Sequence, residues 1–115
     1  MELPKNVQNV IEALLGPAGK SDQALRRTVY EQTRSHAEEI PALRPGASGL
    51  RELVQKISER PWTVSDEDFN KLLQVGYSED QIFDLTVASA AGAGVRRFEA
   101  GLRALADAGA EKTTT

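Results

Sequence analysis

His36 is the one histidine of this 115-residue chain and the side chain best suited to acid–base chemistry. It is followed by Glu38 and Glu39, and a histidine beside carboxylates can serve as a general base or as a metal ligand. A metal site normally takes three or four ligands, and the sequence offers no second histidine, so neither a metal site nor a cofactor is predicted. A cationic side chain near a helix C-terminus is also favourable without catalysis. His36 is therefore a candidate catalytic residue for which a structural role is the simpler explanation.

The absence of cysteine excludes several kinds of chemistry. Disulfide scaffolds, thiolate zinc sites, thiol nucleophiles and dithiol redox motifs all require at least one cysteine. None of these can operate in this chain.

The densest basic features are the pairs Arg26-Arg27 and Arg96-Arg97, and such pairs usually belong to a solvated helix face. Arg96 shares a face with Glu99 and Arg103, which predicts an exposed strip of salt bridges. Arg97 projects in another direction. It is the candidate for binding an anionic ligand or a partner carboxylate, with an ordinary interface ion pair as the alternative. The net charge of −3, from 14 basic and 17 acidic residues, disfavours nucleic acid as a partner.

Apolar residues recur along one side of three segments, and helix-capping signals open two more, which predicts an all-α fold, a compact bundle of about five helices. The first helix ends at Gly16-Pro17, and the second begins after Ser21 and ends before the prolines of segment 40–46. The third helix stops at Pro61. The apolar residues of its repeat are Leu50, Leu53, Val54 and Ile57.

The last two helices are predicted to form a hairpin. Ser65 is the N-cap of the fourth helix, and the acidic run 66–68 places negative charge on its first-turn amides, which explains that run without a calcium site. Gly76 closes this helix, and Ser78 with Gln81 form the capping box that opens the fifth.

The fifth helix is predicted to run to about Asp107, before Gly109 and a polar end. The expected organisation is one domain over residues 1–109, followed by a flexible tail of residues 110–115. Trp62 and Tyr77 each lie just before a helix, where we expect them to seal an end of the core.

The segment Leu85–Val95 of the fifth helix carries no charge and consists mainly of very small side chains. A helix that is apolar all round is normally buried all round, and small residues let neighbouring backbones approach closely. Each glycine costs about 1 kcal/mol relative to alanine inside a helix, so close packing has to offset this cost. Contact with another copy of the chain and enclosure within a monomer are the two explanations. The predicted oligomer interface consists of Ala88, Ser89, Gly92 and Ala93.

The segment from Trp62 to Leu105 resembles the C-terminal half of the alkylhydroperoxidase D and carboxymuconolactone decarboxylase superfamily. The resemblance rests on residues 63–68, on the turn and helix start at 76–85, and on the small-residue helix from Ala88 to Phe98. It implies an all-α, AhpD-like subunit that assembles into trimers or hexamers through such helices. The peroxidase branch uses a Cys-x-x-Cys pair and a following histidine, which this chain lacks, so peroxidase activity is not expected. No functional residue of the decarboxylase branch matches a position here.

The leading functional hypothesis is a non-enzymatic member of this superfamily, acting as an oligomeric binding or accessory protein for a protein partner or a small ligand. One alternative is a thiol-independent enzyme that uses His36 or buried acids for proton transfer on a small carboxylated substrate. Another is a small acidic regulator that binds another protein through its long helix. The sequence shows no signal-peptide pattern and no apolar run near the ~20 residues of a membrane span, so we expect a cytoplasmic protein without membrane contact.

Overall fold

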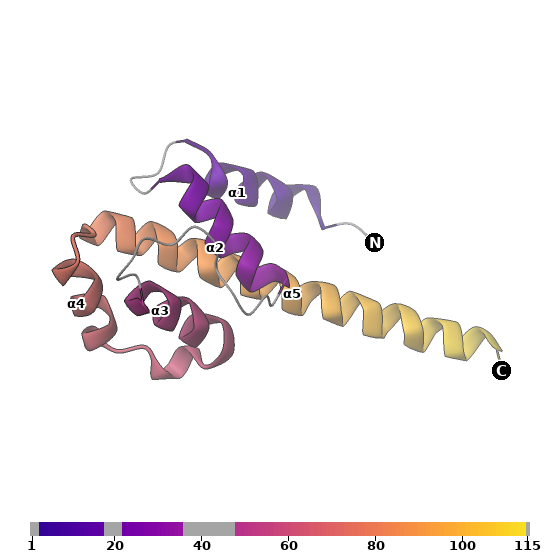
Figure 1. The fold of residues 1–115 in the computed structure, drawn as a ribbon. Helices are drawn as coiled ribbons and strands as arrows, with labels where there is room; N and C mark the ends of the chain where they lie inside the picture. Colours follow the sequence, from indigo (N-terminus) through magenta and orange to yellow (C-terminus); the bar gives the residue numbers. More distant parts are fainter. Residues whose placement is uncertain (1–2, 18–21, 36–47, 115) are drawn as a thin grey trace.

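The computed structural model describes residues 3–17, 22–35 and 48–114, and every regular element in these ranges is helical (Figure 1). The predicted all-α class with five helices and a long last helix is confirmed. His36, Ser21 and segment 40–46 lie outside the described residues. The elements in chain order are α1 Lys5–Leu15, α2 Gln23–Ser35, α3 Ser48–Glu59, a short 3-10 helix η1 Pro61–Thr63, α4 Asp66–Gln74 and α5 Glu79–Thr114.

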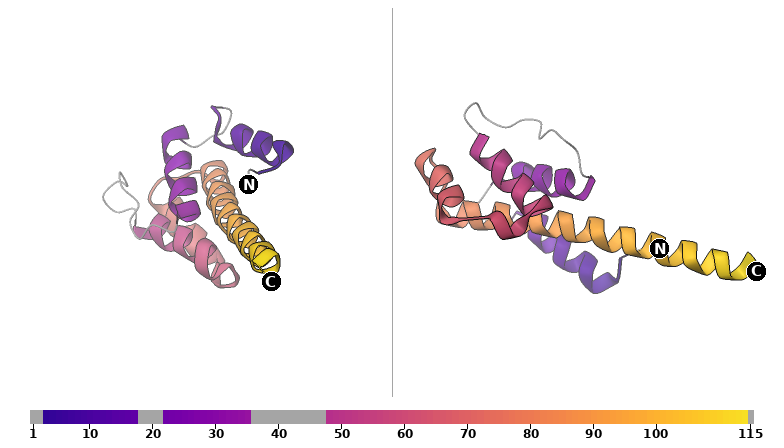
Figure 2. Two further views of the ribbon diagram at one scale, coloured as in Figure 1. Left: turned by 90° about the vertical axis from the view of Figure 1, so that its right-hand side faces the viewer. Right: turned by 90° about the horizontal axis from the view of Figure 1, so that it is seen from below.

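Helix α5 is the axis of the molecule. The other helices gather around its N-terminal half, and its C-terminal part continues well beyond them (Figures 1 and 2). The principal extents are 59 × 28 × 23 Å and the Cα radius of gyration is 16.3 Å. A compact domain of this length has a radius of gyration of about 13 Å, so the chain is more extended than a sphere-like domain of the same size. The cause is the length of α5, which at 1.5 Å per residue is about 54 Å.

The core forms where α2, α3 and α4 meet the N-terminal half of α5. Its apolar side chains come from all five helices, and removing them from water is the main favourable contribution to folding. The predicted repeat of α3 is confirmed, because all four of its apolar residues are buried. The least exposed large apolar side chains are Val29, Leu50, Leu53, Val54, Leu72 and Leu85.

Helix α5 does not end where the sequence predicted. The backbone stays helical past Asp107 and Gly109 to Thr114. A glycine costs helix stability without breaking the helix, and no proline follows to stop it, so the ladder of hydrogen bonds continues. Residues 110–114, predicted as a flexible tail, therefore belong to the backbone of α5.

Burial of α5 is one-sided, which corrects the expectation of a helix enclosed all round. Ala90 and Gly94 are exposed inside the uncharged segment. All four residues predicted as an oligomer interface are buried within the single chain, so they offer no surface to a second copy. The clearest case is Gly92, where an added Cβ would overlap Thr33 Oγ1 and the Tyr30 carbonyl oxygen of α2. Close approach of α2 is thus the structural reason for that glycine.

Buried arginine joins α1 to α2. Arg26 is only 2% exposed, and its guanidinium donates hydrogen bonds to the carbonyl oxygens of Leu14 at 2.7 Å and Gly16 at 2.6 Å. Gln23 donates to the Leu15 carbonyl at 3.0 Å. These carbonyls lie at the end of α1, where the helix itself leaves them without partners. The predicted solvated role of Arg26 is therefore wrong.

Within the described residues, no helix has the length and apolar character needed to cross a membrane.

Candidate binding groove between helices α4 and α5

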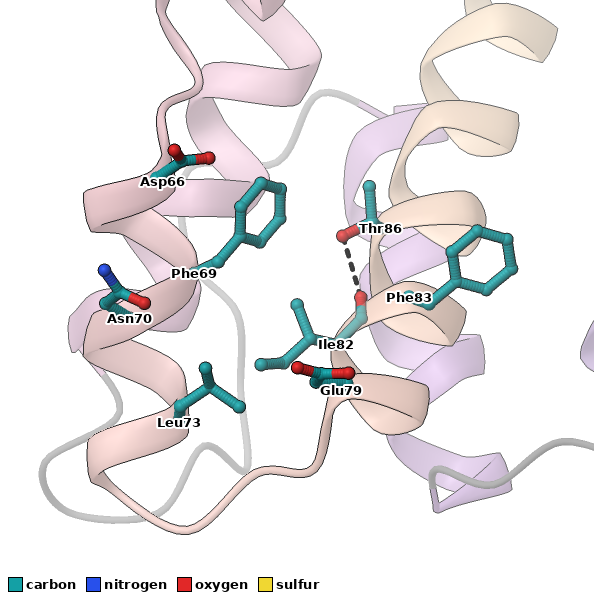
Figure 3. A pocket seen from close by; sticks show the side chains of 8 residues that line it. All are labelled: Asp66, Phe69, Asn70, Leu73, Glu79, Ile82, Phe83 and Thr86. Carbon is teal, nitrogen blue, oxygen red and sulfur yellow. Dashed lines mark hydrogen bonds between the residues drawn. The ribbon is translucent and has the colours of Figure 1, made fainter.

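An open groove of about 470 Å³ lies between α4 and the first turns of α5 (Figure 3). Its middle is apolar, formed by Phe69 and Leu73 of α4 and by Ile82 and Phe83 of α5. Phe83 is 67% exposed and Leu73 is 39% exposed, whereas Ile82 belongs to the core at 4%. The groove is therefore the place where the core opens to solvent. The remaining lining residues are Asp66, Asn70, Glu79 and Thr86.

A sharp turn sets the two walls of the groove beside each other. Gly76 has a φ of +105°, a conformation that favours glycine because it has no Cβ. Its N–H donates to the Leu73 carbonyl at 3.2 Å, and the Tyr77 N–H donates to the Leu72 carbonyl at 3.1 Å. These two bonds form a Schellman motif, as expected for a helix that ends at a glycine.

The start of α5 is fixed by the capping box predicted from the sequence. The Gln81 N–H donates to Ser78 Oγ at 3.1 Å, and the Ser78 N–H donates to Gln81 Oε1 at 2.9 Å. Tyr77 is buried beside this box, which confirms its predicted place at an end of the core. Trp62 is different, because it is 78% exposed on η1 and seals nothing.

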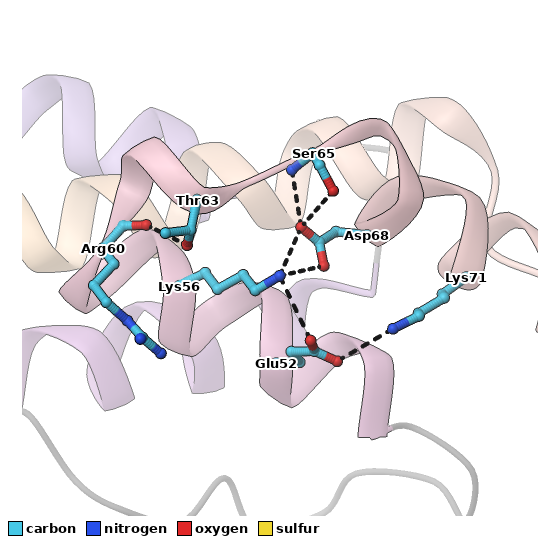
Figure 4. Close-up of polar contacts among 7 residues, drawn as sticks. All are labelled: Glu52, Lys56, Arg60, Thr63, Ser65, Asp68 and Lys71. Atoms are coloured by element: carbon cyan, nitrogen blue, oxygen red, sulfur yellow. Dashed lines mark hydrogen bonds and ion pairs between the residues drawn. The ribbon is translucent and has the colours of Figure 1, made fainter.

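Helix α4 is held to α3 by a partly buried ion pair (Figure 4). Lys56 Nζ of α3 lies 2.9 Å and 3.2 Å from the two carboxylate oxygens of Asp68, which is 3% exposed. Asp68 also accepts the Ser65 N–H at 2.9 Å, so it caps the helix that it anchors. The hydrogen bond from Lys56 lowers the pKa of Asp68, and the same bond raises the pKa of Lys56. Glu52 extends the network to Lys56 at 3.5 Å and to Lys71 at 3.6 Å.

The electrostatic character of the groove is negative at both ends. Asp66 lies at the end that Phe69 occupies and Glu79 at the end that Leu73 occupies (Figure 3). Both carboxylates are exposed, and the residues lining the groove include no lysine, arginine or histidine. An occupant with an apolar middle and a cationic group at each end matches this pattern.

Nothing in the groove has the arrangement of an activated nucleophile. The Thr86 hydroxyl donates to the Ile82 carbonyl at 2.7 Å, a common intrahelical bond that leaves the hydroxyl without an activating base. In the parts of the chain that the structure describes, no three histidine, cysteine, aspartate or glutamate side chains gather closely enough to hold a metal ion. The arrangement favours recognition by shape and charge.

Arg97, the predicted anion-binding residue, donates to the Ser58 carbonyl oxygen at the end of α3. It therefore lies away from the groove and is engaged within the chain. His36, the other candidate, falls outside the described residues, so its role stays a prediction.

The neighbouring Arg96 also bonds within the chain, so the predicted exposed strip of salt bridges is wrong for this residue. It donates to the Thr33 carbonyl at 3.0 Å and to Ser58 Oγ at 2.9 Å, which joins α5 to the C-terminal ends of α2 and α3. Glu99 pairs with Arg34 of α2 at 3.3 Å. Cationic groups at helix C-termini are favourable because the last carbonyls carry partial negative charge.

The sequence predictions missed the groove. The groove could have been predicted from two apolar residues that each directly follow a buried one. These are Leu73, after the buried Leu72, and Phe83, after the buried Ile82. An adjacent residue points about 100° away along a helix, so neither side chain can join the core that its neighbour enters. Both side chains line the groove. Leu73 points from α4 toward α5, whereas the Phe83 ring lies on the side of α5 turned away from α4 (Figure 3).

Comparison with known proteins gives no relatives: no family model, no curated protein and no solved structure matches this chain.

Proposed function

We propose that this chain is a protein-binding accessory domain and that the groove between α4 and α5 takes an amphipathic helical segment with a basic residue at each end. The observation that carries the proposal is an apolar groove with one carboxylate at either end. An apolar cleft of this volume with a few polar groups at its ends is a common form of binding site. A helix that lays its apolar face in a groove is one of the common modes of peptide recognition.

The dimensions support a helical occupant. Asp66 and Leu73 are seven residues apart on α4, which corresponds to a rise of about 10 Å. A bound helix lying along α4 covers the same length between its residues i and i+7. We therefore expect lysine or arginine at i and i+7 and large apolar residues at i+3 and i+4 of the partner segment.

Selection of displayed random peptides on the intact protein tests this proposal. We expect the enriched peptides to carry this basic and apolar pattern, and to lose most of their affinity for a Leu73→Lys variant, because the lysine places charge in the apolar middle. Val75→Lys is the matched control, since Val75 is 54% exposed on the same turn but does not line the groove. Enriched peptides without basic ends, or equal binding to both variants, would contradict the proposal.

Charge removal gives a second test with the same peptides. Asp66→Asn combined with Glu79→Gln is expected to weaken binding by about tenfold, because each exposed ion pair contributes up to about 1 kcal/mol. The effect should shrink as salt is added, since exposed charges are screened. Glu67→Gln, one residue from Asp66 but outside the lining, should change the affinity little. Isothermal titration calorimetry measures all three.

The family resemblance belongs to this proposal as well. We infer kinship with the alkylhydroperoxidase D and carboxymuconolactone decarboxylase superfamily from the helical hairpin of α4 and α5. Cysteine-dependent peroxidase chemistry is impossible, because the chain has no cysteine. A thiol-independent enzyme that uses His36 stays the alternative from another class. An enzymatic activity that is lost in His36→Ala and unaffected by Leu73→Lys would favour the thiol-independent enzyme.

A further inference from the structure

The exposed face of α5 carries large, partly exposed apolar side chains, and glycines beside which the chain leaves open space. Phe98 is 44% exposed and Leu105 is 67% exposed. An added Cβ at Gly94 or Gly101 would meet no atom within 4 Å, in contrast to Gly92. A glycine in an exposed helix interior is less favourable than an alanine. Contacts inside the chain therefore do not explain these two glycines.

These four residues share one face of the helix. At 100° per residue, Phe98, Gly101 and Leu105 lie within about 40° of Gly94 around the axis. The exposed Ala90 continues the same strip toward the N-terminus. We call this strip, residues 90, 94, 98, 101 and 105, the outer face of α5. It contains no charged residue.

We propose that the outer face of α5 pairs with the outer face of a second copy of this chain in an antiparallel dimer. When the helices cross between Phe98 and Gly101, the Phe98 ring of each copy lies over Gly101 of the other. Leu105 then lies over the other copy's Gly94. Every large side chain faces a glycine, which lets the two helices approach closely. In a parallel pair Phe98 would face Phe98 and glycine would face glycine, which leaves the large side chains opposed and gaps between them.

The size of the contact fits a weak dimer. In this register residues 85–114 of the two helices overlap, a length of about 45 Å. With a contact strip about 10 Å wide on each copy, the pair covers roughly 900 Å² in total, below the roughly 1,200 Å² of stable interfaces and in the range of weak, transient ones. The antiparallel direction also places opposite helix-dipole ends together. Self-association is therefore expected at micromolar to millimolar concentration.

Sedimentation over that concentration range tests the proposal. We expect the mass to rise from the 12.5 kDa of one chain toward twice that value. Gly101→Leu should keep the protein monomeric, because the new side chain fills the space that receives Phe98. Ala106→Leu, a similar addition about 120° away from Gly94, is the control and should still dimerise. The Gly101→Leu chain itself should fold, since leucine favours a helix more than glycine does. A mass of one chain at every concentration, or an unchanged dimer in Gly101→Leu, would overturn the proposal.

The direction of pairing has its own test, which uses the absence of natural cysteine. A mixture of Phe98→Cys and Gly101→Cys chains should form disulfide-linked heterodimers under mild oxidation. Phe98→Cys alone should crosslink poorly. Efficient crosslinking of Phe98→Cys with itself would show a parallel pair and overturn the arrangement. Neither test involves Leu73 or Asp66, so the dimer and the proposed groove can fail independently.

Discussion

At the scale of single residues, Asp68 has two structural roles. Its carboxylate caps α4 through the Ser65 N–H and holds Lys56 of α3. Asp68→Ala removes both contacts and leaves the Ser65 N–H and the Lys56 ammonium without their partner. We expect a loss of about 2 kcal/mol in the free energy of unfolding, measured by urea denaturation. Glu67→Ala, in the same turn and exposed, should cost much less.

The same carboxylate makes stability depend on pH. The hydrogen bond from Lys56 lowers the pKa of Asp68 below its unfolded value of about 3.9. A lowered folded-state pKa contributes stability that is fully present above the unfolded value and lost as pH falls through the folded one. The raised pKa of Lys56 acts in the opposite direction: its contribution is present below about 10.4 and lost as pH rises through the folded value.

Urea denaturation at a series of pH values checks this prediction. The stability difference between the natural chain and Asp68→Asn should be constant near neutral pH and should fall away below about pH 4. Asparagine is a suitable control because its amide oxygen can still accept the Ser65 N–H. A difference that persists unchanged in strong acid would show that the ionised form of Asp68 is not what stabilises the fold.

At the scale of elements, two glycines two residues apart in α5 have opposite roles. Gly92→Ala would drive a methyl group into the Tyr30 carbonyl and the Thr33 hydroxyl, so α2 has to move away. We expect a loss of at least about 2 kcal/mol, typical of overpacking in a core. Gly94→Ala meets no neighbour in its own chain and should stabilise the dilute monomer by up to about 1 kcal/mol. Thermal unfolding at low concentration compares the two. Equal effects would contradict the close contact of α2 with Gly92.

Local signals in the sequence were sufficient for the helices and for several of their ends. The Ser78–Gln81 capping box, the Gly76 turn and the α3 repeat depend on residues within one or two helical turns, so all three could be predicted. The end of α5 could not, because Gly109 weakens a helix without stopping it. Local patterns decide where a helix starts more firmly than how far it continues.

The partners of side chains that reach from one helix to another could not be predicted from the sequence. Arg26 and Arg96 were predicted as solvated, yet both bond to carbonyl oxygens at the ends of other helices. The pairing of Asp68 with Lys56 crosses from α4 to α3 in the same way. Which helix end an arginine reaches depends on packing between helices, and periodicity describes only one helix at a time. The groove was missed for this reason too, since its walls come from two helices.

At the scale of the whole molecule, α5 has two halves in different surroundings. Its N-terminal half is packed against α2 and α3, whereas its C-terminal half extends beyond the body (Figure 1). A short helix without tertiary contacts is marginal in water, so the outer half should open locally far more often than the packed half.

Hydrogen exchange along α5 tests this difference. In dilute protein, we expect the amides of residues 98–109 to exchange much faster than those of residues 82–96. At concentrations that support pairing of the outer face, exchange in 98–109 should slow. Gly101→Leu should abolish the concentration dependence while Ala106→Leu retains it. Uniform protection along α5 in dilute protein would contradict the division into two halves.

The Gly76 turn affects how the groove between α4 and α5 can change. The residues from Val75 to Ser78 alone join the two walls of the groove, so they fix both the spacing of the walls and their rotation relative to each other. One inserted residue in this connector would disturb the Schellman bonds and rotate the α4 wall relative to the α5 wall, with no wall residue altered. The shape of the groove, and with it the binding preference that we propose, can therefore change through the length of four connecting residues as readily as through substitutions in the groove.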